Sequence, residues 1–269
     1  MTKLISALRR SGAAACAAAV AVLRALTTAK VQEGDIPYAV YVLLASGGLL
    51  LLWDSLTRRH YAPAFTRGGR FRVYPFCFAA AAGFFAEFVL YCHLIYQSVE
   101  NGVYHLFAAF APLCLVCFGA LFSGFYCGAM GVSFATDRYD FRRLRLMHLM
   151  PVLWAGGHIL QLLTVNDVLQ PHTVLRYAAM AAALLFFFFL VIEVERGAGA
   201  MGLTVFLARA FFWLTALYGC DTVILLLAGR VALLSTDTEL AAAMVLIGSF
   251  ALFFSLNILS NTKTSTESH

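Results

Sequence analysis

Glu87 lies near the middle of a mostly apolar run, Tyr74 to Gln97, so the chain places a carboxylate near the centre of an expected membrane-spanning helix. An ionisable side chain there costs roughly 2.5–3.5 kcal/mol on insertion scales. Such a side chain therefore normally faces the protein interior, pairs with another group or is protonated. The chemistry that such a carboxylate offers is proton binding or ion pairing. Glu87 is therefore the first candidate for a polar site inside the protein.

Four histidines are expected in the outer half of the bundle, above Glu87. His93 ends the second expected span, His105 opens the third, His158 lies inside the fourth and His172 immediately precedes the fifth. Imidazole groups together with a carboxylate are typical ligands of zinc or iron. The chain has no HExxH or other compact ligand spacing. We therefore expect no cofactor and keep zinc or iron as the alternative.

Two further charges, Arg209 and Asp221, lie inside the sixth expected span. Their separation in sequence corresponds to about 18 Å along a helix, so they cannot pair directly with each other. Arg209 either extends toward the inner side or pairs with Glu87 or Glu193 across helices. Asp221 has a short side chain that cannot reach the membrane surface as easily, which makes it a second candidate for an interior carboxylate.

Long apolar segments must position these side chains. Hydrophobic residues make up 62% of the chain and charged residues only 12%, whereas about a quarter of the residues in soluble proteins are charged. A helix crosses the membrane with roughly 20 apolar residues, and the continuous runs differ from the alternating strands of a membrane barrel. The sequence therefore predicts an all-α, polytopic membrane protein, a bundle of seven transmembrane helices at residues 37–56, 74–98, 103–127, 147–165, 173–194, 202–228 and 240–259.

The segment before the first span has a different composition. Residues 1–32 combine basic side chains with a short Ala-rich run that Arg24 interrupts. This pattern is typical of a secretory signal or a mitochondrial presequence, and also of an amphipathic helix on the membrane surface. Residues 33–260 are then one seven-helix transmembrane domain, and residues 261–269 are a polar tail.

Arginines gather in two of the expected loops and indicate the orientation. The loops after the first and third spans are basic, whereas the loops after the second and fourth have no Lys or Arg, so the basic loops face the cytoplasm or the mitochondrial matrix. We expect contacts between anionic lipid head groups and nine arginines, namely Arg58, Arg59, Arg67, Arg70, Arg72, Arg138, Arg142, Arg143 and Arg145. This bias accounts for the net charge of +5 without nucleic acid. A plasma membrane or endomembrane is favoured, with the mitochondrial inner membrane as the alternative.

Cys114 and Cys117 form a CxxC in the middle of the third expected span. A redox CxxC needs an exposed thiolate, usually at the start of a helix. The position of this one predicts packing, and the seven scattered cysteines indicate no disulfide framework.

Residues 37–259 resemble the transmembrane protein 45 family, a seven-helix family. The matching residues are Gly83, Ala86, Glu87, His93, His105, Gly157, the stretch His172 to Tyr177, Glu193, the pair Phe212 and Trp213, and Asn257. Family members carry a His-x-His near the end of the fourth span, where this chain has Gln161 and Leu163. That departure weakens a metal site carried over from the family. The resemblance implies a multi-pass membrane protein with no assigned catalysis.

Three functions follow from these features. The first is a non-enzymatic accessory or scaffold-like component with membrane-protein partners. The second is a proton-coupled or metal-linked transporter centred on Glu87. The third is an intramembrane metalloenzyme that uses the outer histidines, with Glu87 or Asp221 as base. The first is preferred, because the resemblance implies no assigned catalysis; the chain also has no GxSxG elbow, P-loop or dinucleotide fingerprint that would indicate an enzyme.

Overall fold

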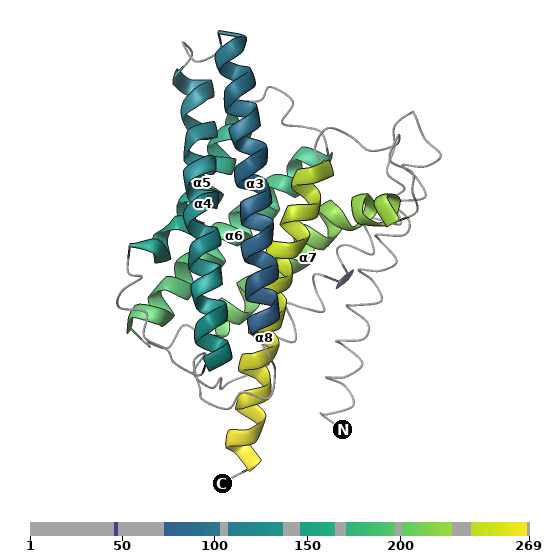
Figure 1. Ribbon diagram of the computed structural model, residues 1–269. Coiled ribbons are helices and arrows are strands. Elements are labelled where there is room, and N and C mark those ends of the chain that lie inside the picture. The colour runs from purple at the N-terminus through teal and green to yellow at the C-terminus, as the bar shows by residue number, and fades with distance from the viewer. Residues whose placement is uncertain are drawn as a thin grey trace.

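A computed structural model describes residues 46–47, 73–102, 107–136, 146–164, 171–196, 201–227 and 238–267 of the chain. All regular secondary structure in these ranges is helical (Figure 1). The helices discussed below are α3 (Tyr74–Glu100), α4 (Phe107–Thr136), the short 3-10 helix η3 (Met147–Leu149), α5 (Met150–Leu163), α6 (Pro171–Arg196), α7 (Met201–Leu227) and α8 (Thr238–Glu267).

Five of these helices are long and apolar enough to cross a membrane. The spans are Tyr74–Glu100, Phe107–Thr136, Thr173–Glu195, Met201–Gly219 and Leu240–Ile258. They correspond to the second, third, fifth, sixth and seventh spans expected from the sequence. The protein is therefore a helical, multi-pass membrane protein.

The other two expected spans have different outcomes. The fourth is divided between η3 and α5, and α5 has 14 residues, fewer than the roughly 20 that a span requires. The first expected span lies almost wholly outside the described residues, as do the N-terminal segment 1–32 and the nine arginines of the basic loops. The seven-span count, the role of the N-terminal segment and the lipid contacts of those arginines thus stay predictions.

Local sequence explains where two helices begin and one ends. Pro75 and Pro151 lie in the first turn of α3 and α5, where the missing N–H of proline costs no hydrogen bond within the helix. Gly102 follows the end of α3 with a φ of 72°, a left-handed conformation that glycine adopts without steric cost. Its N–H donates to the Val99 carbonyl and so closes the last turn.

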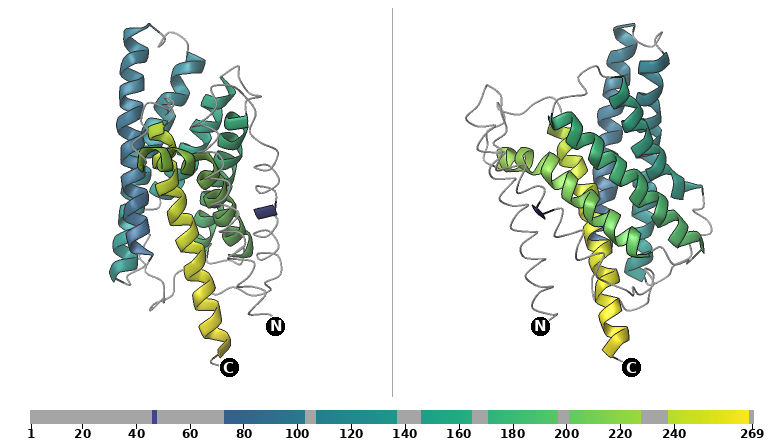
Figure 2. Two further views of the ribbon diagram at one scale, coloured as in Figure 1. Left: turned by 90° about the vertical axis from the view of Figure 1, so that its right-hand side faces the viewer. Right: turned by 180° about the vertical axis from the view of Figure 1, so that it is seen from behind.

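The described helices pack in a closed ring. Each helix from α3 to α8 contacts the next one in sequence, and α8 contacts α3. Viewed from behind, α6 and α7 lie across the side of the bundle opposite α3 and α4 (Figure 2). At the top of Figure 1, the end of α3 and the start of α4 extend beyond the other helices. The ring gives the protein an interior that several helices share.

Aromatic side chains fill a large part of that interior. Phe84 of α3 lies edge-on to Trp154 of α5, with ring centroids 4.9 Å apart. Phe186 of α6 contacts Phe250 of α8 at 6.2 Å, and Phe187 of α6 contacts Trp154 at 6.4 Å. We call the buried set the aromatic core; its members are Phe84, Trp154, Phe186, Phe187, Phe211, Phe250 and Phe254. Edge-to-face pairs of this kind stabilise a fold beyond the area that they bury.

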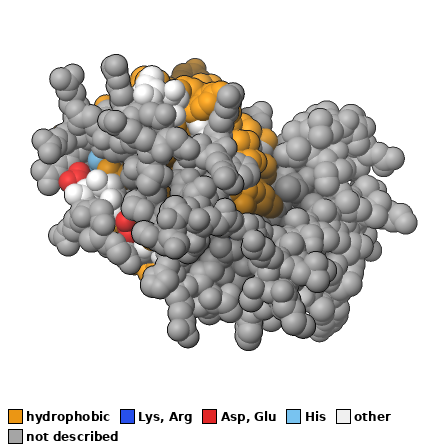
Figure 3. All heavy atoms as spheres, turned by 90° about the horizontal axis from the view of Figure 1, so that it is seen from below, with side chains coloured by type: hydrophobic (Ala, Val, Ile, Leu, Met, Phe, Trp, Pro, Cys, Tyr) orange, Lys and Arg blue, Asp and Glu red, His pale blue; other side chains and the backbone are white. Residues whose placement is uncertain are grey.

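The end of the bundle next to the basic loops carries polar side chains among the apolar ones. His148 of η3 is buried, and its Nδ1 lies 3.5 Å from Oε1 of Glu195 at the end of α6. Seen from below, acidic side chains and a histidine appear together at one edge of the described surface (Figure 3). We refer to this end as the inner end and to the opposite one as the outer end.

Candidate functional site

Glu87 lies on the buried face of α3. The residues of this face recur every three or four positions, at Ala80, Phe84, Glu87 and Tyr91, which is the spacing of side chains on one side of an α-helix. The exposed fraction of Glu87 is 0%. The periodicity of α3 therefore turns the carboxylate into the ring, as the sequence predicted for a charge at this depth.

Two side chains of α5 contact one oxygen of this carboxylate. Trp154 Nε1 donates a hydrogen bond to Glu87 Oε2 at 2.6 Å, and His158 Nε2 lies 3.2 Å from the same oxygen. Trp154 and His158 are four residues apart, so both extend from the same face of α5. The exposed fraction of each is 0%. The carboxylate is thus positioned by a neighbouring helix.

The network continues toward the outer end from the second nitrogen of His158. His158 Nδ1 lies 3.3 Å from the Tyr91 hydroxyl and 3.4 Å from Arg176 Nη2. The Tyr91 hydroxyl donates to Gln161 Oε1 at 2.6 Å, and Gln161 is only partly buried. Polar groups therefore lead from Glu87 to a side chain near the outer end. We call Glu87, Tyr91, Trp154, His158, Gln161 and Arg176 the Glu87 network.

The donors and acceptors of this network assign a tautomer to His158. A guanidinium has only donors, so Arg176 requires an unprotonated Nδ1. The single proton of the Tyr91 hydroxyl is directed at Gln161, so the Tyr91 oxygen can only accept and forms no hydrogen bond with an unprotonated Nδ1. His158 then carries its proton on Nε2 and donates it to Glu87 Oε2. A neutral imidazole in this form connects a carboxylate to a guanidinium.

The second oxygen of Glu87 has different surroundings. Oε1 is buried and has no hydrogen-bond partner within the part of the chain that the structure describes. A buried polar atom without a hydrogen bond carries a free-energy cost of roughly 1–3 kcal/mol, and more for a charged group. Oε1 is therefore an acceptor atom of this network whose burial is not offset by a hydrogen bond among the described residues.

The structure brings together only some of the side chains that the sequence singled out. Glu87 and His158 are in contact. His93 is exposed on α3, and its Nε2 lies 2.9 Å from Gln97 Nε2 of the same helix. Arg209 is buried on α7, with an exposed fraction of 3%. The structure thus places His158 beside Glu87 and His93 on the exposed surface of α3.

The remaining candidates lie partly or wholly outside the residues that the structure describes. His105 lies between α3 and α4, outside the described residues. His172 and Asp221 belong to the backbone of α6 and α7, but their side chains lie outside the description. Among the described residues, no group of three His, Cys, Asp or Glu side chains is arranged to hold a metal ion. Because His105 and His172 are not part of that set, the zinc or iron alternative stays untested.

Sequence analysis missed Tyr91, Trp154 and Arg176 as members of the network. Two of them carried a usable signal, because Tyr91 follows Glu87 by four residues and Trp154 precedes His158 by four. Each therefore shares a helix face with a residue already selected. Arg176 also lies in an apolar stretch, inside the segment that resembles the transmembrane protein 45 family. Its partner on α5 could be recognised only once the neighbours of α6 were known.

No protein-family model, curated protein or solved structure matches the chain significantly.

Proposed function

We propose that this membrane protein is a proton-coupled transporter of the transmembrane protein 45 type, with seven spans and with Glu87 as its proton-binding group. The observation that carries the proposal is the contact of Glu87 with His158, two titratable side chains that are 0% exposed inside a membrane bundle. Ionisable pairs at this depth are costly, and in membrane proteins they usually mark ion or substrate pathways and proton relays.

The distribution of polar and aromatic side chains gives the proposed path a direction. Polar groups lie on the outer side of Glu87. Tyr91 follows Glu87 by one turn of α3 and contacts His158 and Gln161 of α5. On the inner side, Phe84 lies one turn below Glu87 and belongs to the aromatic core. Protons therefore reach Glu87 from the outer end, and the aromatic core separates the Glu87 network from the inner end.

Proton binding changes the charge of the network in one step. With Glu87 ionised, its negative charge offsets the positive charge of Arg176 across the neutral His158 ring. A proton that adds to Oε1 converts the carboxylate into a neutral carboxyl group and removes one negative charge from the neighbourhood of Arg176. Protonation therefore weakens the electrostatic attraction between Glu87 of α3 and Arg176 of α6 and changes the relative stability of different arrangements of these helices. This coupling is the physical basis of the proposed transport.

Proton flux into liposomes tests the proposal. The full-length protein is reconstituted with a pH-sensitive dye inside, and flux is driven by an acidic outside and a potassium diffusion potential. We expect the wild type to acidify the lumen faster than empty liposomes and Glu87→Gln to match empty liposomes. Glu100→Gln is the matched control, because Glu100 is exposed and bonded only to Tyr96 within α3 among the described residues. Proton flux in wild type that Glu87→Gln leaves unchanged would refute the assignment of Glu87.

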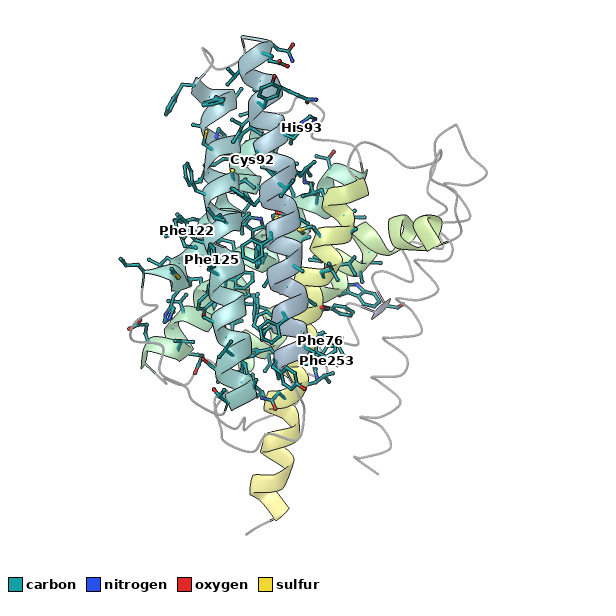
Figure 4. The ribbon with its side chains drawn as sticks, in the orientation of Figure 1. Phe76, Cys92, His93, Phe122, Phe125 and Phe253 are labelled. Carbon is teal, nitrogen blue, oxygen red and sulfur yellow. The ribbon has the colours of Figure 1, made fainter. Side chains whose placement is uncertain are left out.

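A second candidate is the accessory or scaffold-like component that the sequence favours. The aromatic core supports it, because a filled interior leaves the lipid-facing surface as the place for partners. Large exposed side chains there include Phe118, Phe122 and Phe125 of α4, and Figure 4 labels two of them. Under this alternative the Glu87 network is structural. Wild-type protein that is folded and gives no flux above empty liposomes, while Glu87→Gln unfolds more easily, would favour this candidate over transport.

A further inference from the structure

Two cysteines from adjacent helices meet at the outer part of the bundle. Cys92 Sγ of α3 lies 3.7 Å from Cys117 Sγ of α4. Cys92 is exposed and Cys117 is buried. Figure 4 labels Cys92 in the upper half of α3, beside α4. We propose that Cys92 and Cys117 are a dithiol pair that closes to a disulfide by exchange with a small disulfide at the outer face.

The depth of this pair places it near the outer surface of the membrane. A hydrocarbon layer of about 30 Å corresponds to about 20 helical residues. Counted from Tyr74, the inner end of α3, that length reaches about residue 94. Counted back from Thr136, the inner end of α4, it reaches about residue 116. Cys92 and Cys117 are thus within one turn of the boundary. The basic loops put this boundary on the extracytoplasmic side, where disulfides form and persist in plasma and endomembranes.

Geometry selects this pair among the described cysteines. A disulfide requires the two sulfur atoms to approach to about 2.05 Å, which from 3.7 Å needs a change of side-chain rotamer on helices that already pack together. Cys114 and Cys117 lie on the same continuous helix, α4. Cys77 and Cys127 are both 0% exposed, so an external disulfide cannot reach them. Among the described cysteines, Cys92 alone combines an exposed thiol with a sulfur contact across helices.

The exchange proceeds in two balanced steps with oxidised glutathione as the oxidant. The Cys92 thiol loses its proton and attacks one sulfur of glutathione disulfide, forming a Cys92–glutathione mixed disulfide and releasing one reduced glutathione. The Cys117 thiol then loses its proton and attacks the Cys92 sulfur, forming the Cys92–Cys117 bond and releasing a second glutathione. The protein loses two protons and two electrons, and glutathione gains both.

The bond would act on the part of α3 that enters the Glu87 network. Cys92 directly follows Tyr91, the residue that contacts both His158 and Gln161. Because the outer ends of α3 and α4 extend beyond the other helices (Figure 1), their mutual contact determines how far they can move. The disulfide would therefore hold the outer end of α3 against α4. The proposal rests on the cysteine geometry and on the orientation indicated by the basic loops, and it does not depend on proton transport.

Thiol mapping of the purified full-length protein tests the proposal. The protein is fully reduced, freed of reductant, incubated in detergent with oxidised glutathione, alkylated and digested for mass spectrometry. We expect the wild type to yield a peptide linked through Cys92 and Cys117. Cys117→Ser should stop at the mixed disulfide on Cys92, and Cys92→Ser should form neither product. Cys114→Ser and Cys127→Ser are the matched controls and should form the link as the wild type does.

Three results would overturn the proposal. The first is a wild type that accumulates the mixed disulfide on Cys92 without closing the bond. The second is a bond from Cys92 to Cys114 in place of Cys117. The third is a Cys92 that stays unmodified in the folded protein while the same protein, unfolded in dodecyl sulfate, reacts with glutathione disulfide.

Discussion

Trp154 and His158 both direct an N–H group at the same oxygen of Glu87. The position of the carboxylate on α3 therefore depends on α5. Trp154 is the more revealing of the two donors, because indole only donates and cannot change its role when Glu87 gains a proton.

Trp154→Phe should destabilise the protein through the lost hydrogen bond. Phenylalanine keeps most of the ring contacts with Phe84 and Phe187 but leaves His158 as the sole donor to Glu87 among the described residues. A hydrogen bond to a charged group contributes about 1.5–3 kcal/mol, so the free energy of unfolding should fall by about that amount. Unfolding in mixed detergent and dodecyl sulfate, followed by circular dichroism, measures it.

Trp213→Phe is the matched control for the ring contacts. Trp213 is also buried, but its Nε1 has no hydrogen-bond partner in the described part of the chain. The same change of side chain there removes no hydrogen bond of this kind. If the free energies of unfolding of the two variants differ by less than about 0.5 kcal/mol, the Trp154–Glu87 hydrogen bond contributes little to stability.

For single residues, the sequence indicated which ionisable side chains lie in apolar segments, but it did not indicate all of their partners. The cost of a carboxylate in an apolar helix selected Glu87, and an imidazole inside a span selected His158. Both conclusions need only the neighbours along the chain. The contacts of Trp154 and Arg176 with this pair depend on how α5 and α6 are rotated about their axes, which local sequence does not determine.

Among the helices, the contact between α4 and α5 positions the donors. A Cβ atom added at Gly119 of α4 would lie 2.7 Å from Trp154 Cα and 2.8 Å from Trp154 N. On the other helix, a Cβ at Gly157 would lie 2.9 Å from Val116 Cγ2. Small residues of this kind allow membrane helices to approach closely. The backbone of α5 is thus held at the distance from which Trp154 reaches Glu87.

Gly119→Ala should push α5 away from α4 and destabilise the bundle. Overpacking of a close contact costs about 1–3 kcal/mol, and here the clash is with backbone atoms that cannot rotate away. Gly128→Ala on the same helix is the control, because a Cβ there has no neighbour within 4 Å. Dodecyl sulfate unfolding of both variants tests the prediction. Equal stability of the two variants would show that α4 and α5 are not held by this contact.

The positions of most helices could be predicted from hydropathy, whereas the fourth expected span differs from the prediction. Long apolar runs determine α3, α4, α6, α7 and α8, because burial in lipid acts on composition. The segment 147–165 is apolar as well, but Pro151 and the 3-10 turn before it leave a regular α-helix of only 14 residues. Composition alone does not show where a regular α-helix is interrupted.

For the whole molecule, the ring of helices and the basic loops predict one orientation in the membrane. Asn101 at the end of α3 and Thr136 at the end of α4 are both exposed and lie at opposite ends of the bundle. Thr136 directly precedes the loop that contains Arg138 and Arg142. Since basic loops stay on the cytoplasmic side, Thr136 should face the cytoplasm and Asn101 the opposite side.

Labelling of introduced cysteines in sealed microsomes, whose outer surface is cytoplasmic, checks this orientation. In a Cys92→Ser background, an impermeant maleimide should modify Thr136→Cys in intact vesicles. It should modify Asn101→Cys only after detergent opens them, and the parent without added cysteines gives the background signal. The reverse pattern would put the Glu87 network and Cys92 on the cytoplasmic half, so protons would enter from the cytoplasm and the dithiol pair would face a reducing compartment. The sidedness of Asn101 therefore decides the direction of the proposed proton path and the redox environment of Cys92 together.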